Sequence, residues 1–325
     1  MERKWHEASF EPENVRRAKE IGELHKRSTQ MTNEQVRKLV HNVFDVHTHS
    51  GPDTSIYRFY DDWENAKQFM EWGMAGFAVK VHAGDSSRST AIVQKIANEY
   101  AEAHGFNKIR ILGGVCLNYS VGGWNSEAVR TAAAFGGKFV WTPTLDASHD
   151  RKVVGRTGGL EVINSSGKLL SEVEAVLKTV AEHDLILSIS HQSTEERFAL
   201  VEAATQLGIK GIIIDHPHQA NTKMTVEQME EFTKIGANLG IYSHVDSREA
   251  LAILERIPHE RLLFGSDKGF IMGPPPAEGL REFIARLLLL GVAERTIRRV
   301  FVENPHTLVF DSAQVGNESE IQRAR

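Results

Sequence analysis

The stretch Val43–His49, VFDVHTH, combines the pattern of a buried strand with two histidines one residue apart. Side chains two residues apart on a strand point to the same face, so Asp45, His47 and His49 are expected to share one face. Two imidazoles on one face are either core histidines with local hydrogen bonds or two ligands of one divalent metal ion. The rest of the sequence decides between these interpretations.

Short apolar runs of this kind recur along the chain and alternate with amphipathic, helix-like segments. The runs are Val43–His49, Gly76–His82, Arg110–Leu117, Phe139–Leu145, Leu185–His191, Lys210–His216, Asn238–Ser243 and Leu262–Asp267. Near-continuous apolar strands that alternate with helices indicate a parallel sheet of the α/β class. Eight such units fit the size and count of a closed (β/α)8 TIM barrel. A doubly wound open sheet is the alternative, but no Gly-x-Gly-x-x-Gly motif follows any run.

The barrel would occupy the middle of the chain. Residues 43–310 contain the eight units, residues 1–42 read as a charged N-terminal helical extension, and residues 311–325 form a polar C-terminal tail. One long glycine-rich connection, Asp146–Lys168, follows the fourth run, and long loops of this kind are often functional or disordered.

Composition limits the partners and the compartment. Lys and Arg number 38 and Asp and Glu 43, so the net charge of −5 argues against a nucleic-acid or anionic-membrane partner. The single cysteine, Cys116, builds neither an internal disulfide nor a thiolate metal site. The first ten residues lack a secretory apolar run, and LLLLGV is too short to cross a bilayer. We therefore expect a cytoplasmic protein that acts on a small molecule, with a homo-oligomer through residues 1–42 left open.

Polar side chains stand at the ends of several predicted strands. His191 ends the fifth run, His216 ends the sixth and is followed by His218, and Asp267 ends the eighth. The carboxyl ends of all barrel strands meet at one rim, where active sites form. The pair in the first run would therefore meet His191, His216 and Asp267, whereas His218, after Pro217, is expected in a loop or an outer position. This convergence favours a metal site over isolated core histidines.

The same ordered set resembles the amidohydrolase superfamily of metal-dependent barrel hydrolases. His-x-His on the first strand, histidines on the fifth and sixth, aspartate on the eighth and a closing ENPHTLVF helix carry the resemblance over residues 43 to about 310. It implies a metal bound or contacted by His47, His49, His191 and Asp267. His216 would be a ligand in a binuclear site or a polarising group in a mononuclear one. The short sequence motifs are most similar to a poorly characterised branch of this superfamily. The resemblance therefore implies no substrate.

One departure from the family concerns the group that bridges two metal ions. Members often use a carboxylated lysine or a glutamate on the third or fourth strand, and neither RILGGVCLN nor FVWTPTLD offers one at the rim. The nearest substitute is Lys80 on the second run, which shares a face with His82. If it is interior, Lys80 could carry a carbamate or pair with Asp267 or a substrate anion; otherwise it could extend outward.

The sequence gives weaker support for the remaining rim candidates, which are possible substrate contacts. They are Arg58, His82, Thr144, His149, Tyr242 and His244. The cationic members point to an anionic substrate. The expected cofactor is a divalent metal, zinc first and manganese, iron, cobalt or nickel as alternatives, with one or two ions bound.

The leading functional hypothesis is a hydrolase that attacks an amide, lactam, lactone or ester with metal-activated water, with Asp267 as general base and acid. A non-hydrolytic decarboxylase on the same barrel is the first alternative. A barrel nuclease can also begin with His-x-His, but the net charge counts against it. A non-catalytic metal-binding protein is the last alternative, and it would lack an open coordination position.

Overall fold

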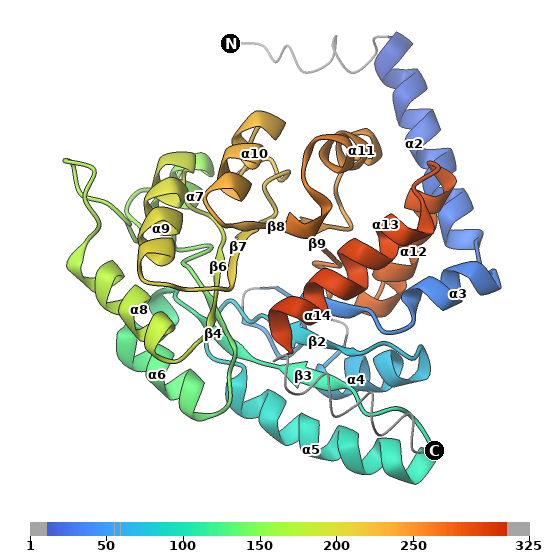
Figure 1. Cartoon of the computed structure of the whole chain (residues 1–325), viewed down its shortest axis with the longest axis horizontal. Helices are drawn as coiled ribbons and strands as arrows, with labels where there is room; N and C mark the ends of the chain where they lie inside the picture. Colours follow the sequence, from blue (N-terminus) through green and yellow to red (C-terminus); the bar gives the residue numbers. More distant parts are fainter. Residues whose placement is uncertain (1–11, 55, 59, 311–325) are drawn as a thin grey trace.

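A computed structural model describes residues 12–54, 56–58 and 60–310 of the chain. The predicted tail, 311–325, and the first eleven residues of the predicted N-terminal extension lie outside these residues. Parallel strands form the centre and helices surround them (Figure 1). The strands are β1 Phe44–Thr48, β2 Gly76–Val79, β3 Arg110–Leu112, β4 Gly114–Cys116, β5 Phe139–Trp141, β6 Ile186–Ile189, β7 Ile212–Asp215, β8 Asn238–Tyr242 and β9 Leu262–Gly265.

The strands form a TIM barrel of the α/β class, as the sequence predicts. The strand order is β1-β2-β3 in one sheet and β4 through β9 in the other. Only Gly113 separates β3 from β4, so the two are halves of one barrel strand. A side chain at Gly113 would lie 2.5 Å from Thr90 Oγ1 and 2.6 Å from Ser87 Cα, so helix α5 (Ser87–His104) approaches the backbone at this break. Counted this way, eight barrel strands match the eight predicted runs.

The last strand returns to the first. The backbone N–H of Asp267 donates to the carbonyl of His47 at 3.0 Å, and the N–H of His49 donates to the carbonyl of Lys268 at 2.8 Å. These bonds close the barrel between β9 and β1, which we call the β1–β9 seam. His47 and His49 thus lie on one side of the seam and Asp267 on the other.

Helices cover the outside of the barrel and the amino-terminal end of its strands. They are α2 Pro12–Gln30, α3 Glu34–Val40, α4 Asp62–Glu71, α5, α6 Ser126–Ala134, α7 Ser148–Val153, α8 Ser171–Glu182, α9 Thr194–Gln206, α10 Val226–Lys234, α11 Ser247–Arg256, α12 Pro276–Leu289, α13 Glu294–Arg298 and α14 Asn304–Val309, with short turns η1 Tyr119–Val121, η2 His259–Arg261 and η3 Arg299–Glu303. Within the described residues, no helix combines the length and the apolar character that crossing a bilayer requires.

Two apolar layers hold the fold together. The outer layer lies between strands and helices and includes Val140 and Ile214. The inner one fills the barrel with side chains such as Phe44, Trp141 and Ile213. The ring of Phe44 meets that of Phe310, just after α14, at 5.7 Å, so this end of the barrel is plugged by apolar side chains. The opposite end, where the strands finish, is left for polar groups.

Candidate metal centre

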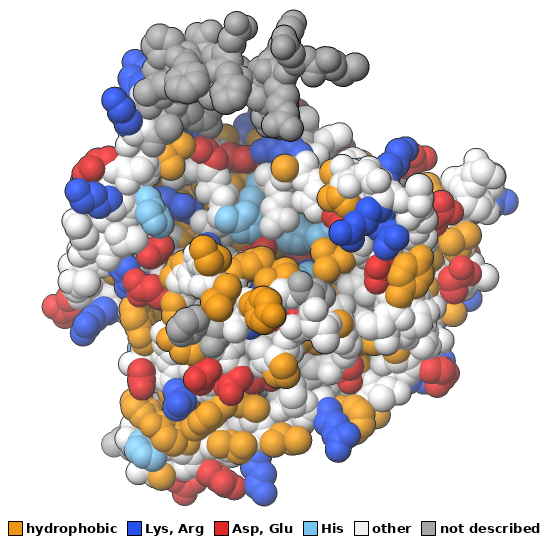
Figure 2. Space-filling view, turned by 180° about the vertical axis from the view of Figure 1, so that it is seen from behind, with side chains coloured by type: hydrophobic (Ala, Val, Ile, Leu, Met, Phe, Trp, Pro, Cys, Tyr) orange, Lys and Arg blue, Asp and Glu red, His pale blue; other side chains and the backbone are white. Residues whose placement is uncertain are grey.

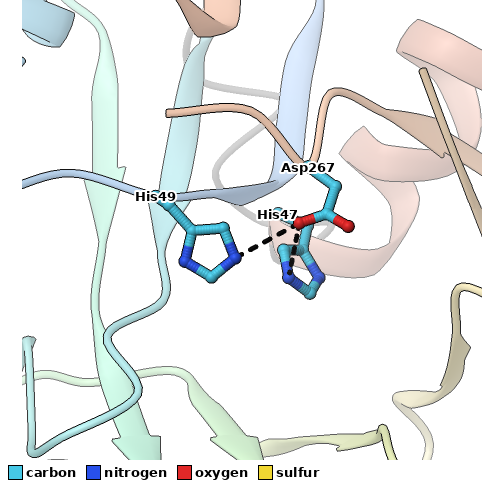
Figure 3. A group of neighbouring side chains, drawn as sticks. All are labelled: His47, His49 and Asp267. Atoms are coloured by element: carbon cyan, nitrogen blue, oxygen red, sulfur yellow. Dashed lines mark ion pairs between the residues drawn. The ribbon is translucent and has the colours of Figure 1, made fainter. Parts of the chain in front are cut away.

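His47, His49 and Asp267 form a buried group at the carboxyl end of the barrel. Their candidate ligand atoms all lie within 4.8 Å of one another. Asp267 Oδ1 is 3.2 Å from His49 Nε2 and 3.6 Å from His47 Nε2, and both imidazoles point toward the carboxylate (Figure 3). The space-filling view shows histidine side chains gathered in a hollow on this face (Figure 2).

The backbone of β1 departs from the strict alternation that the sequence predicts. Its register against β2 shifts between Asp45 and Thr48. Val46, which alternation places outside, packs with the side chains inside the barrel. Asp45 Oδ1 accepts the backbone N–H groups of Ser266 at 3.0 Å and His47 at 3.3 Å. Asp45 therefore links the two sides of the β1–β9 seam by accepting hydrogen bonds from backbone groups.

Each ring of the histidine pair is held through its Nδ1 atom. His49 Nδ1 lies 2.8 Å from the carbonyl oxygen of Lys80, so it donates there, and its Nε2 is left with a free lone pair that faces Asp267. His47 Nδ1 lies 3.1 Å from the Tyr242 hydroxyl, which itself donates to Asp215 Oδ1 at 2.5 Å. Such outer contacts fix the tautomer and orientation of metal-binding imidazoles.

The donor atoms fit a divalent metal ion. His47 Nε2 is buried and has no hydrogen-bond partner, although it faces Asp267. A metal ion bound between this imidazole nitrogen and the carboxylate would give the nitrogen the partner that it lacks. Imidazole and carboxylate donors suit zinc and the other first-row divalent ions.

His191 and His216 line the same hollow next to this group. The rings of His191 and His216 are 5.0 Å apart, and the ring of His216 is 5.9 Å from that of His47. His191 Nδ1 contacts Asp150 Oδ1 at 2.8 Å, whereas His216 Nδ1 is buried without a partner. His216 and Asp267 also adopt positive φ angles of 33° and 47°. Non-glycine residues in this region are uncommon and concentrate at functional sites.

Electrostatics favour the metal-binding protonation states of His49, His216 and Asp267. Burial, the largest effect, lowers the pKa of His49 to about 4. Burial also lowers the pKa of His216 well below its usual range. Burial alone would raise the pKa of Asp267, but His47 and His49 hold it well below the usual carboxyl range. Neutral imidazole and ionised carboxylate are the ligand forms that a divalent ion needs.

Three more predicted residues stand on the β2 and β5 side of the hollow. Lys80 is 1% exposed and follows β2. The ring of His82 stacks on that of His49 with centroids 4.9 Å apart, and His82 Nδ1 lies 3.1 Å from Thr144 Oγ1. Asn118 Nδ2 donates to the carbonyl of His82 at 2.8 Å. The structure therefore brings Lys80, His82 and Thr144 to the metal group.

Arg58 and His244 lie at the edges of the group. Arg58 is bound by Asp53 Oδ2 at 2.8 Å and lies over the Phe270 ring at 4.8 Å. That ring is 6.3 Å from the ring of His49. His244 Nδ1 lies 3.7 Å from Asp267 Oδ2.

Two predicted substrate contacts have other surroundings. Tyr242 is fully buried beneath His47, and a side chain at Gly240 would lie 2.4 Å from its hydroxyl, so the glycine makes room for the ring. This position suits orientation of His47. His149, in α7, bonds the carbonyl of Asn221 at 3.0 Å and lines a surface hollow with Ser148 and Lys152.

Sequence reasoning missed the residues that hold the histidines in place. Asp215 ends β7 inside the barrel. Asp150 in α7 and Asn221 in the loop after β7 lie beside His191. Gln219 Nε2 donates to Asp267 Oδ2 at 3.1 Å. A carboxylate at the end of the apolar run IIID was the one available signal, since such a group needs buried partners.

Comparison with known proteins places the fold. An amidohydrolase from Pseudomonas aeruginosa superposes with a TM-score of 0.56 at 12% identity, covering 89% of this chain and 97% of that one. A putative 2-pyrone-4,6-dicarboxylic acid hydrolase from Pseudomonas putida gives 0.51 at 13%, covering 82% and 97%. A 2,6-dihydroxybenzoate decarboxylase from Rhizobium gives 0.50 at 11%, covering 82% and 98%.

These structures confirm the predicted resemblance to the amidohydrolase superfamily at the level of the fold. No curated protein matches the sequence. Residues 42–240, more than half of the chain, match a family described as a family of unknown function, DUF6282. The chain therefore belongs to the DUF6282 family and folds as an amidohydrolase-type barrel with a buried His-His-Asp group suited to a metal.

Proposed function

We propose that this protein is a metal-dependent hydrolase of small molecules that cleaves an amide, lactam, lactone or ester bond. The observation that carries the proposal is the buried group of two histidines and an ionised aspartate, with one imidazole nitrogen left without a partner. A divalent ion held there supplies a Lewis acid and lowers the pKa of water toward about 7. Zinc is the first expectation, with one or two ions bound.

Asp267 and His216 would carry out the other steps of the reaction. Asp267 faces the histidine pair with Oδ1 and turns Oδ2 toward Gln219 and His244. It can therefore take a proton from the attacking water and return it to the leaving group. The unpartnered His216 Nδ1 is available to orient the oxygen of the scissile carbonyl.

A metal-dependent decarboxylase is the second candidate. The fourth barrel strand, β5, carries no lysine or glutamate that could bridge two ions, which suits a mononuclear site. Hydrolases and a decarboxylase both occur among the solved barrels of this fold. Products formed in ¹⁸O-labelled water separate the two reactions, because only hydrolysis places the label in the organic product, whereas decarboxylation labels only the carbon dioxide, by its exchange with water.

The test of the hydrolase proposal uses Asp267→Asn in the metal-loaded protein. A panel of esters, lactones, lactams and amides first identifies a substrate. The variant should keep its fold and most of its metal but lose about 10²-fold or more in turnover, the scale of a general acid–base contribution. Asp184→Asn, at a surface carboxylate 70% exposed, is the matched control and should keep wild-type turnover. Wild-type turnover in Asp267→Asn would remove Asp267 from the mechanism.

A further inference from the structure

Lys80 is a buried cation inside the barrel. Its residue is 1% exposed, and its alternation along the chain places it on the side of Ala78, which packs with the inner apolar cluster. Burial lowers the pKa of His191 and His216 most, and the positive charge of Lys80 lowers both further. The ammonium group is therefore within electrostatic reach of two predicted ligands. The side chain does not extend to solvent.

The carboxylates of the barrel interior are committed to other partners. Asp215 Oδ1 accepts from Tyr242, and its Oδ2 accepts from Ser188 and Ser190 at 2.6 and 3.0 Å. Asp267 faces the histidine pair and Gln219. Among the described residues, no carboxylate forms an ion pair with Lys80 Nζ. The pairing with Asp267 that the sequence left open is absent from this structure.

A largely buried ammonium with no carboxylate in contact is suited to an anion, since little water reaches it and the charge of Asp215 acts on it only through space. We propose that Lys80 binds a carboxylate group of the substrate and so selects anionic substrates at the metal centre. The inference rests on the proposed function for the place of the substrate. It makes Lys80 a specificity-determining residue: its ammonium donates to a carboxylate oxygen while the reacting bond lies at the metal.

The alternative role for Lys80 is as a carbamate, formed by carboxylation of its side-chain amine. A carbamate would replace a cation by an anion close to Asp215 and Asp267, which already supply two buried negative charges. A substrate carboxylate balances the ammonium without changing the charge of the protein. The charges inside the barrel therefore favour an uncarboxylated Lys80 ammonium.

The test compares acetate with acetamide, which have the same shape and differ in charge. Titration calorimetry at constant ionic strength measures both dissociation constants in metal-loaded wild type, Lys80→Met and Lys80→Arg. Wild type and Lys80→Arg should prefer acetate by about tenfold or more, and Lys80→Met should lose most of that preference at unchanged metal content. Lys138→Met, which removes a lysine outside the barrel, is the matched control and should bind like wild type.

Stability provides a readout that does not depend on the reaction. Because methionine removes a largely buried charge that no carboxylate contacts, metal-free Lys80→Met should melt at a higher temperature than metal-free wild type in a chloride buffer without carboxylates. Acetate should raise the melting temperature of wild type but not of this variant. These measurements hold even if the protein proves not to be a hydrolase, which metal content and turnover test separately.

Three results would each overturn the inference. One is an equal affinity of wild type for acetate and acetamide. Another is an acetate preference that survives in Lys80→Met. The third is a carbamate resonance from ¹³C-bicarbonate that is present in wild type and absent in Lys80→Met.

Discussion

At the scale of single residues, Asp215 is the group on which the orientation of His47 depends. Its Oδ1 accepts the Tyr242 hydroxyl and lies 3.4 Å from His47 Nδ1. We expect Asp215→Asn to weaken zinc affinity by about 10–100-fold, the usual effect of removing an outer partner of a metal-binding histidine. Competition with a chromophoric chelator measures the affinity. Asp184→Asn again serves as the control, and equal affinities in the two variants would contradict the role of Asp215.

The proximity of His47, His49 and Asp267 was predictable because all three stand at strand ends, and parallel barrel strands end at one rim. Asp150 was not predictable in the same way. It lies in α7, inside the connection that the sequence marks only as long and glycine-rich. Nothing in the local sequence determines where such a connection places its side chains, because its path depends on tertiary packing.

At the scale of secondary-structure elements, Arg281 joins α12 to the end of α2. Its guanidinium donates to the carbonyls of Ser28, Thr29 and Met31 at 3.0, 3.1 and 2.5 Å. The final carbonyls of a helix have no partner within the helix, so Arg281 satisfies groups that would otherwise need water. The two elements lie side by side in Figure 1.

We expect Arg281→Met to lower the free energy of unfolding by about 1–3 kcal/mol, because it removes several charge-assisted hydrogen bonds from a buried arginine. Urea denaturation measures the change. Arg299→Met is the matched control, since Arg299 is 44% exposed and pairs with Glu303 on the surface, where the loss is about 0.5 kcal/mol or less. Equal losses in the two variants would show that Arg281 does not anchor α2.

The eight barrel strands were predictable because apolar runs that alternate with amphipathic segments have few other stable arrangements. The break at Gly113 and the register shift in β1 were not. Both depend on contacts between distant elements. Helix α5 packs closely against Gly113, and Asp45 accepts a hydrogen bond from the backbone of Ser266 across the seam. The hydrophobic periodicity of one strand does not indicate such contacts.

At the scale of the whole molecule, the candidate ligands lie on both sides of the β1–β9 seam. A bound ion would therefore fasten the first strand to the last. A ligand at one hundred times its dissociation constant stabilises the native state by about 2.7 kcal/mol. We expect chelation to lower the melting temperature by roughly 5 °C in calorimetry, and added zinc to restore it. The melting temperature of the double variant His47→Ala, His49→Ala should not change when the chelator is added. An unchanged melting temperature in metal-free wild type would contradict the inference that a bound ion links the first strand to the last.

The position of the seam also sets a time at which the metal centre can be completed during protein synthesis. His49 precedes Asp267 by 218 residues (267 − 49). At about 5–20 residues per second, the ribosome needs roughly 10–40 s to add the chain between them. Throughout this interval the nascent chain offers the histidine pair but not the carboxylate. Metal acquisition with the full His-His-Asp group must therefore follow synthesis of nearly the entire barrel.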